Sequence, residues 1–420
     1  MGQISLRMSD LDLSGSAAGG TGVCEFWFDY SCPYAYLAST QVEALAARTG
    51  ARLVWEPMLL GGVFKANATP QNLSEVLSPA KRRHNELDMQ RWAQHWSVPL
   101  NKPAAHPMRT VGALRATLAC GVDPRVVHGF YRAYWVEGRE PSAPETIRDV
   151  VSAAGHDADA VLARIDDQAI KDDLRARTDR AIEKGIFGAP AFVVGDKMWW
   201  GQDRMHFVEL ALGGTPPRAE PRAPTRPHQL EVYFDFSSPF SYLGLSQAES
   251  LAARTGAKLV VRPMLLGAVF KAIGTVDAPM LSWSAAKQRY TMEDMLRWSA
   301  HWGVPLQWPS RFPINSVKAL RCYLALPEER RKDFRDATYH AFWAEDRDIA
   351  SDDVLRGLLG GGADDILAKT QTKEVKDALF SATQHAVEAG VFGAPTWVVD
   401  GEHLFWGQDR LDLVEAALRR

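Results

Sequence analysis

Hydrophobic and polar positions follow a clear succession near the start of the chain. Apolar alternation in CEFWFDY (24–30) predicts a strand near the centre of a sheet. The next stretch, PYAYLASTQVEALAARTG (33–50), begins with proline at the first helical position and ends at a glycine, as helices often do. ARLVWEPMLL (51–60) predicts a second strand. The pattern therefore opens with a strand, a helix and a strand.

A long helical region follows, and two strands and a helix close the pattern. Residues 72–185 carry helical periodicity with little strand character. After them, PAFVVGD and KMWWG indicate a hairpin, and DRMHFVELALGG indicates a last helix. This is the element order of an α/β, thioredoxin-like domain with a large all-helical insertion. In that order Pro190 takes the place of a cis-proline facing the active-site turn, although proline is also tolerated at the first residue of a strand.

The whole pattern occurs twice. FWFDYSCPYAYLASTQVEALAARTGARLVWEPMLLGGVFKA, from Phe26, recurs as VYFDFSSPFSYLGLSQAESLAARTGAKLVVRPMLLGAVFKA, from Val232, roughly 200 residues later. A repeat of this length is a domain, because solenoid units are several times shorter. Two copies with similar surfaces can pack about a pseudo-twofold axis, as a homodimer does about a true one. We therefore expect two thioredoxin-like domains arranged as a fused dimer.

Four segments follow from this repeat. The first is a flexible or disordered tail, and the third is a proline-rich linker that is semi-extended by composition. Each domain contains its own helical insertion. The predicted segments are the tail 1–22, domain one 23–213 with its insertion at about 72–185, the linker 214–229, and domain two 230–420 with its insertion at about 278–390.

Composition narrows the function classes. The 420 residues carry a formal net charge of -3, which gives no electrostatic case for a nucleic-acid or membrane partner. Residues 1–22 hold no signal-like apolar run, and no later stretch approaches the ~20 apolar residues of a membrane span, so we expect a cytoplasmic protein. The spacing of the cysteines predicts neither structural disulfides nor a metal site. The four cysteines are Cys24, Cys32, Cys120 and Cys322.

Several motifs of the second copy together resemble a known family. They are FDFSSPFSYL, PMLLGAVFKAIGT, RWSAHWGVPL, VFGAPTWVV and FWGQDR. These motifs are similar to the 2-hydroxychromene-2-carboxylate isomerases and the related kappa-class glutathione transferases, in the DsbA-like branch of the thioredoxin superfamily. The resemblance covers each copy from end to end. It implies glutathione as cosubstrate, and a small aromatic substrate.

The resemblance implies chemistry at the turn before the first helix of each copy. In the family, a serine before the helix-starting proline donates a hydrogen bond to the thiolate of bound glutathione; that position is Ser238 in copy two and Cys32 in copy one. Because Ala35 stands where a redox C-x-x-C motif has its second cysteine, Cys32 is either a low-pKa thiol or a small buried replacement. A helix cap is the plainer interpretation of Ser238, although we expect the neighbouring Ser31 and Ser237 to do the local capping.

The resemblance also places glutathione. The residue before the cis-proline offers its backbone to the cysteinyl part, the polar pair opening the last helix meets the γ-glutamyl carboxylate, and a lysine pairs with the glycyl carboxylate. A threonine stands where the family often has asparagine. Helix capping is the alternative for the aspartates, and simple solvent exposure for the lysines. The expected glutathione-binding residues are Ala189, Pro190, Gln202, Asp203 and Lys81 in copy one, and Ala394, Pro395, Gln408, Asp409, Lys287 and Thr275 in copy two.

Three functions remain open from the sequence. The leading hypothesis is a glutathione-dependent isomerase or transferase that acts on an aromatic or conjugated ketoacid by reversible thiolate addition, with no metal. The alternatives are a thiol-disulfide oxidoreductase that uses Cys32 with glutathione, and a non-catalytic binding module, which a buried turn at 237–239 would favour. Six aromatic residues are candidates to floor a pocket for a flat substrate, although core packing is the commoner use of tryptophan and we favour it for Trp92 and Trp298. The six are Trp199, Trp200, Phe405 and Trp406, with Trp92 and Trp298.

Overall fold

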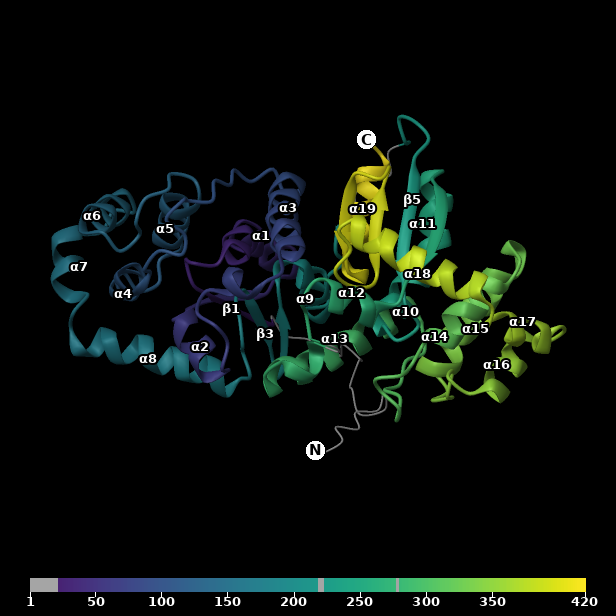
Figure 1. The fold of residues 1–420 in the computed structure, drawn as a ribbon. Coiled ribbons are helices and arrows are strands. Elements are labelled where there is room, and N and C mark those ends of the chain that lie inside the picture. Colours follow the sequence, from purple (N-terminus) through teal and green to yellow (C-terminus); the bar gives the residue numbers. More distant parts are fainter. Residues whose placement is uncertain (1–21, 218–222, 277–278) are drawn as a thin grey trace.

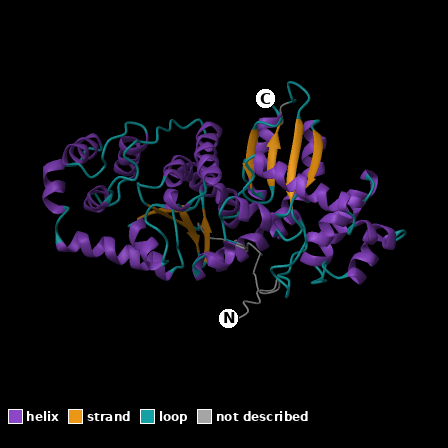
Figure 2. Cartoon of the chain, viewed as in Figure 1, coloured by secondary structure: helices purple, strands orange, loops and turns teal. Residues whose placement is uncertain are grey.

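The computed structural model describes residues 22–217, 223–276 and 279–420, which form two separate four-stranded sheets surrounded by helices (Figure 2). Apart from Gly22, the tail expected at 1–22 lies outside the described residues, as does the centre of the expected linker. The element order of each copy is the predicted one. The two-domain α/β fold is therefore confirmed.

The sheet of copy one is mixed. Strand β1 runs parallel to β2 and antiparallel to β3, and β3 pairs with β4 in a hairpin. Because β1 lies inside the sheet, its residues Phe26, Trp27 and Phe28 are fully buried. In spatial order the strands are β2 (Arg52–Pro57), β1 (Val23–Phe28), β3 (Ala191–Val194) and β4 (Lys197–Trp200).

Helices surround this sheet and fill the predicted insertion. The first helix ends at Gly50, whose positive φ of 68° suits glycine. The helices of copy one are α1 (Pro33–Thr49), α2 (Leu60–Ala66), η2 (Leu73–Val76), α3 (Pro79–His95), α4 (Val111–Ala119), α5 (Pro124–Trp135), α6 (Pro144–Ala153), α7 (Ala158–Arg164), α8 (Gln168–Glu183), η3 (Gln202–Arg204) and α9 (Met205–Ala211).

Copy two repeats this arrangement. Its strands, in spatial order, are β6 (Lys258–Pro263), β5 (Gln229–Phe234), β7 (Thr396–Val399) and β8 (His403–Trp406). Its helices are α10 (Pro239–Leu245), α11 (Ala248–Thr255), α12 (Leu266–Ala272), η4 (Pro279–Ser282), α13 (Ala285–Trp302), α14 (Val317–Ala325), α15 (Glu328–Trp343), α16 (Asp352–Leu359), α17 (Ala363–Lys369), α18 (Lys373–Glu388), η5 (Gln408–Arg410) and α19 (Leu411–Leu418).

One helix differs between the copies. The counterpart of α1 is broken into α10 and α11, where the Gln247 N–H donates to Gly244 O at 3.0 Å in a tight turn. Gly244 replaces Ala38 of copy one, and glycine lowers helix propensity. A side chain at position 244 would crowd the loop that contains Pro395, because its Cβ would lie 3.0 Å from Pro395 Cγ.

Helices α3 and α13 occupy the middle of the molecule, and the helical insertions form its two ends (Figure 1). Each central helix packs against the hairpin of the other copy. Arg91 of α3 donates to Leu404 O at 2.5 Å and covers the ring of Phe405 at 3.9 Å. The reverse contact also forms: Arg297 of α13, in copy two, lies 5.2 Å from the ring centre of Trp199 in copy one.

Buried ion pairs join α3 and α13 to the 3-10 turn that follows the hairpin of the other copy, η5 or η3. Arg410 binds Asp88 through two nitrogens, at 2.8 and 3.2 Å, and Arg204 binds Asp294 through two nitrogens, both at 2.9 Å. Arg204 and Arg410 also each bind an aspartate of the other copy's last 3-10 turn (η5 or η3). Each ion pair that crosses the boundary therefore has a counterpart in which the two copies exchange roles.

Candidate functional site

A buried aspartate fixes each turn that carries a predicted catalytic residue. Asp29 accepts hydrogen bonds from the N–H of Ser31 at 2.9 Å, the N–H of Leu60 at 2.8 Å and the hydroxyl of Thr110 at 2.9 Å. Asp235 takes the same place in copy two. Burial raises the pKa of both carboxyls. Sequence reasoning missed these residues, although a lone acid between aromatics at the end of each buried strand was a usable signal.

Ser238 lies where the turn meets α10. Its hydroxyl accepts the Ser241 N–H at 3.1 Å and donates to Ala394 O at 2.9 Å. Ser238 is thus itself the helix cap, and the expectation that Ser237 and Ser31 do the capping is wrong. Those serines are held instead by the buried aspartates: the N–H of Ser237 donates to Asp235, and both the N–H and the hydroxyl of Ser31 donate to Asp29.

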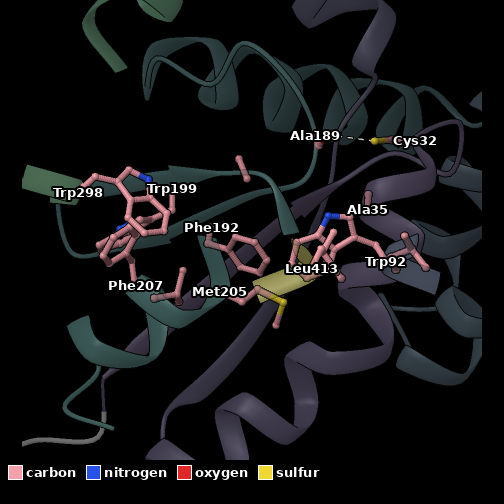
Figure 3. Packing of buried hydrophobic residues seen from close by; sticks show 14 of the residues in the cluster. Cys32, Ala35, Trp92, Ala189, Phe192, Trp199, Met205, Phe207, Trp298 and Leu413 are labelled. Carbon is pink, nitrogen blue, oxygen red and sulfur yellow. Dashed lines mark hydrogen bonds between the residues drawn. The ribbon is translucent and has the colours of Figure 1, made fainter. Parts of the chain in front are cut away.

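Cys32 has the same position in copy one (Figure 3). Its thiol donates to Ala189 O at 3.1 Å, and its side chain makes no capping hydrogen bond. Burial raises the pKa of the thiol to about 12, although the N–H groups of Ala35 and Tyr34 act in the opposite direction. The structure therefore favours the neutral thiol over the thiolate.

The loops that face these turns carry the expected cis-prolines. The peptide bonds Ala189-Pro190 and Ala394-Pro395 are both cis, which confirms that prediction. Ala189 and Ala394 are buried, and their carbonyls accept the bonds from Cys32 and Ser238. The backbone before each cis-proline is thus in direct contact with the turn.

The polar pairs that open the last helices lie at the boundary between the copies. Asp409 accepts from Arg204 at 2.7 Å, and Asp203 accepts from Arg410 at 2.6 Å. The N-cap positions of these 3-10 turns are occupied by Gly201 and Gly407, and the aspartates lie within the turns. The preceding residue in each pair, Gln202 or Gln408, is buried. The aspartates are therefore committed to arginines, and their role toward glutathione stays a prediction.

The two lysines are not simple surface residues. Lys81 Nζ lies 4.9 Å from the ring centre of Trp406, and Lys287 Nζ lies 4.3 Å from that of Trp283. Burial lowers the pKa of both amines. Thr275 follows α12 and donates its N–H to Phe270 O at 2.8 Å, a backbone contact that leaves its predicted role open.

Trp200 and Trp406 lie against the cis-proline loops. A Cβ built at Gly188 would lie 2.6 Å from Trp200 Nε1, and one at Gly393 would lie 2.3 Å from Trp406 Nε1, so both positions need glycine for close approach. The other candidates, Trp199 and Phe405, are buried, as are Trp92 and Trp298. Figure 3 shows Trp298 beside Trp199, and the hydrophobic core continues from one copy into the other.

Trp200 and Trp406 each form a hydrogen bond with a residue of the opposite copy. In copy two, the backbone N–H of Trp406 donates to His84 Nε2 at 3.1 Å. In copy one, the backbone N–H of Trp200 donates to the Tyr290 hydroxyl at 2.9 Å. His84 and Tyr290 are counterparts in the repeat. Sequence reasoning missed both residues because each acts in the copy to which it does not belong.

Two hollows in the surface lie away from the turns and the cis-proline loops. One of about 410 Å³ lies between α2, α4 and α8, and one of about 250 Å³ lies beside α14. Neither is lined by Cys32, Ser238 or a cis-proline. Within residues 22–217, 223–276 and 279–420, no group of His, Cys, Asp and Glu is arranged to hold a metal ion, and no helix is long and apolar enough to cross a membrane.

Comparisons with known proteins agree with this geometry. A family model described as a DSBA-like thioredoxin domain matches residues 23–213 and 229–419. The chain is 30% identical over 201 residues to a 2-hydroxychromene-2-carboxylate isomerase of Pseudomonas sp. (strain C18), which covers 47% of this chain and 93% of that protein. A 2-hydroxychromene-2-carboxylate isomerase of Sphingobium xenophagum is 31% identical over 196 residues, or 46% of this chain and 98% of the relative.

Two further matches are of the same kind. Glutathione S-transferase kappa 1 of Rattus norvegicus is 30% identical over 206 residues, or 45% of this chain and 89% of the relative. A solved structure of a 2-hydroxychromene-2-carboxylate isomerase covers 46% of this chain and 94% of that chain, with 28% identity and a TM-score of 0.42. The chain therefore belongs to the DsbA-like thioredoxin domain family, as a tandem of two domains of the 2-hydroxychromene-2-carboxylate isomerase and kappa-class glutathione transferase kind.

Proposed function

We propose that the protein is a glutathione-dependent isomerase of the 2-hydroxychromene-2-carboxylate isomerase type, or a transferase of the kappa type, and that it works from copy two. Its substrate is a small aromatic or conjugated ketoacid. The observation that carries the proposal is Ser238, held between the start of α10 and the carbonyl before cis-Pro395. The isomerase relatives support the reaction type, and the glutathione S-transferase kappa 1 relative supports glutathione as the cosubstrate.

Ser238 is oriented to donate one hydrogen bond. The Ser241 N–H occupies a lone pair of its oxygen, so the hydroxyl proton is the group left to interact with a partner. In the structure that partner is Ala394 O. We infer that the proton turns toward the sulfur of glutathione, where it stabilises the thiolate. Bound glutathione supplies a soft nucleophile that is also a good leaving group.

The residues around the turn fit glutathione in part. Lys81 and Lys287 offer cations to its carboxylates, and Ala394 offers its backbone beside Ser238. Asp203 and Asp409 are held by arginines instead. We place the protein in the cytoplasm, where glutathione keeps thiols reduced. We also infer that the two copies form a fused pseudo-dimer, in keeping with the reciprocal ion pairs at their boundary.

Burial of the turn favours a second candidate, a non-catalytic binding module. Ser238 is 3% exposed, so neighbouring side chains must move before a ligand sulfur reaches it. The oxidoreductase alternative is weakened, because the raised pKa of Cys32 disfavours the reactive thiolate. Slow labelling of Cys32 by iodoacetamide at pH 8 is the expected result, and rapid labelling below pH 7 would revive that alternative.

Titration calorimetry with glutathione tests the proposal. The wild type, Ser238→Ala and the matched variant Cys32→Ala are compared, and the same proteins are assayed with 2-hydroxychromene-2-carboxylate. Weaker binding and lost turnover in Ser238→Ala alone are expected. Binding without turnover in every protein would favour the binding module, and no binding at all would overturn the proposal.

A further inference from the structure

The hollow beside α14 lies in the helical insertion of copy two, at the end of the molecule where Figure 1 labels α14, α16 and α17. Its volume is about 250 Å³. Four of its six lining residues carry side-chain hydrogen-bond donors, two of these are cations, and none of the six is acidic. The donors are Asn315, Lys318, Arg321 and Gln371, and Val317 and Ala350 complete the lining. The lining therefore suits a negatively charged ligand.

Arg321 is the most deeply placed donor of this group for which no acceptor is present. It is partly buried, and its Nε is buried without a hydrogen-bond partner. In the part of the chain that the structure describes, Arg321 also forms no ion pair. Buried donors without acceptors are rare and call for a ligand or water, and a guanidinium group matches carboxylates and phosphates. Arg321 is thus one half of an ion pair.

Copy one shows the same arginine with its anion. Arg115 is the counterpart of Arg321, and its Nη1 lies 3.1 Å from Asp166 Oδ1. In copy two the position of Asp166 is taken by Gln371, which lines the hollow together with Arg321. The Nε of Arg115 also has no partner, so the difference between the copies is one of charge. The exchange of aspartate for glutamine leaves the arginine of copy two without its neutralising carboxylate.

Two further exchanges act at the same place. In copy one the Ser142 hydroxyl accepts the backbone N–H of Gly112 at 3.0 Å and that of the next residue at 3.3 Å, in the first turn of α4. Its counterpart Ala350 has no hydroxyl to accept from the first turn of α14. Gly112 is replaced by Lys318, whose ammonium group pairs with the exposed carboxylate of Asp352. The exchanges add room and positive charge at a helix N-terminus, which itself attracts anions.

We propose that this hollow binds the oxyanion group of a small molecule, a carboxylate or a phosphate, with Arg321 and Lys318 as its cations. The bound group takes the part that the Asp166 carboxylate has in copy one. The hollow is smaller than the roughly 300–1,000 Å³ of pockets that enclose a whole ligand, so it holds a small ion or the charged end of a larger molecule. Because neither Ser238 nor Lys287 lines it, the site is separate from the predicted glutathione site of copy two.

Titration calorimetry of the full chain with inorganic phosphate and, separately, with malonate tests this proposal. The variants are Arg321→Gln, which removes the cation, and Gln371→Asp, which restores the carboxylate that copy one has. Arg115→Gln is the matched control, because it removes the counterpart arginine. We expect one ion bound per chain, with affinity at least about tenfold weaker in both variants and within about twofold of the wild type in the control.

The charge exchange keeps the test sharp even if Arg321→Gln folds poorly. Gln371→Asp supplies an internal ion pair, so it should preserve the unfolding temperature while it weakens anion binding. Unchanged affinity in Gln371→Asp, or no binding of either ion to the wild type, would overturn the site. Tighter binding of phosphate would support it and identify a phosphorylated ligand, and tighter binding of malonate would support it and identify a carboxylic acid.

Glutathione distinguishes this inference from the proposed function. Glutathione should bind Gln371→Asp as it binds the wild type, and an equal loss of glutathione and phosphate affinity would overturn the separation of the two sites. A wild type that binds phosphate or malonate through Arg321 but does not bind glutathione would support the oxyanion site and reject the proposed function.

Discussion

Copies one and two share a fold but differ at the turn. Ser238 both caps α10 and donates to the carbonyl before cis-Pro395, whereas Cys32 keeps only the second contact, as a buried thiol with a raised pKa. Around the turn the copies remain alike, with the same buried aspartate and the same cis-proline. Closely similar surroundings thus hold a hydroxyl that caps the helix in one copy and a buried thiol in the other.

The ion pairs at the boundary allow the largest effect to be predicted. Asp88→Ala removes two charge-assisted hydrogen bonds from the buried Arg410 guanidinium, and Asp294→Ala removes two from Arg204, while Asp203 and Asp409 still neutralise both arginines; each change should lower the free energy of unfolding by about 3 kcal/mol. Urea unfolding followed by circular dichroism measures both. Similar losses are expected from the two copies, because the pairs are counterparts.

Arg148→Ala is the control, since its partner Asp159 is exposed and such pairs contribute little. A loss from Asp88→Ala no larger than that of the control would contradict a boundary held by buried charge.

Substitution of the turn residue should reduce catalysis in copy two but not in copy one. Ser238→Ala removes the donor proposed to stabilise the thiolate, so kcat/KM for 2-hydroxychromene-2-carboxylate should fall about 10²–10³-fold. Cys32→Ala should leave kcat/KM within about twofold, because a neutral buried thiol offers little to the reaction. Steady-state assays with glutathione present provide the measurement. Equal losses from both changes would mean that copy one is also active.

Crowding the cis-proline loops tests the tryptophan contacts. Gly393→Ala places a Cβ 2.3 Å from Trp406 Nε1, and Gly188→Ala places one 2.6 Å from Trp200 Nε1, so both should destabilise the protein by about 1–3 kcal/mol. Thermal unfolding is the readout. Gly361→Ala is a suitable control, because nothing lies within 4 Å of its Cβ position. No difference from this control would mean that the indoles move freely.

The smallest expected difference between the copies is in how each contributes to the pH dependence of stability. Burial, Arg410 and Arg91 lower the pKa of His84 to about 3, whereas its counterpart Tyr290 does not titrate in acid. Below the usual histidine pKa near 6.5 the unfolded chain takes up a proton that the folded chain refuses. The associated stability is therefore complete above about pH 6.5 and is lost as the pH falls toward 3.

His84→Tyr should remove this pH dependence. At pH 5.5 the loss of stability relative to pH 7 should be about 1 kcal/mol smaller in the variant than in the wild type. Urea unfolding at the two pH values gives the comparison. Parallel losses in both proteins would show that His84 is protonated in the folded state.

Sequence reasoning recovered the features that depend on local pattern. The strand at 24–30, the helix from Pro33 to Gly50 and cis-Pro190 all followed from periodicity, end signals and element order. It did not recover Asp29, whose role depends on an N–H from α2 and a hydroxyl before α4. It also misplaced the capping serine, because adjacent serines differ only in what packs against them.

The sequence by itself determined the tandem repeat, the order of strands and helices, and which residues occupy the two turns. These properties are local, or follow from direct comparison of the two copies. Only the tertiary structure decided that the Cys32 thiol is buried, that Asp203 and Asp409 bind arginines, and that Lys81 and Lys287 each lie against a tryptophan of the other copy. The physical reason is that burial and charge pairing arise from segments far apart in the sequence, within copy one for Cys32 and across the two copies for the aspartates, and no local pattern encodes that packing.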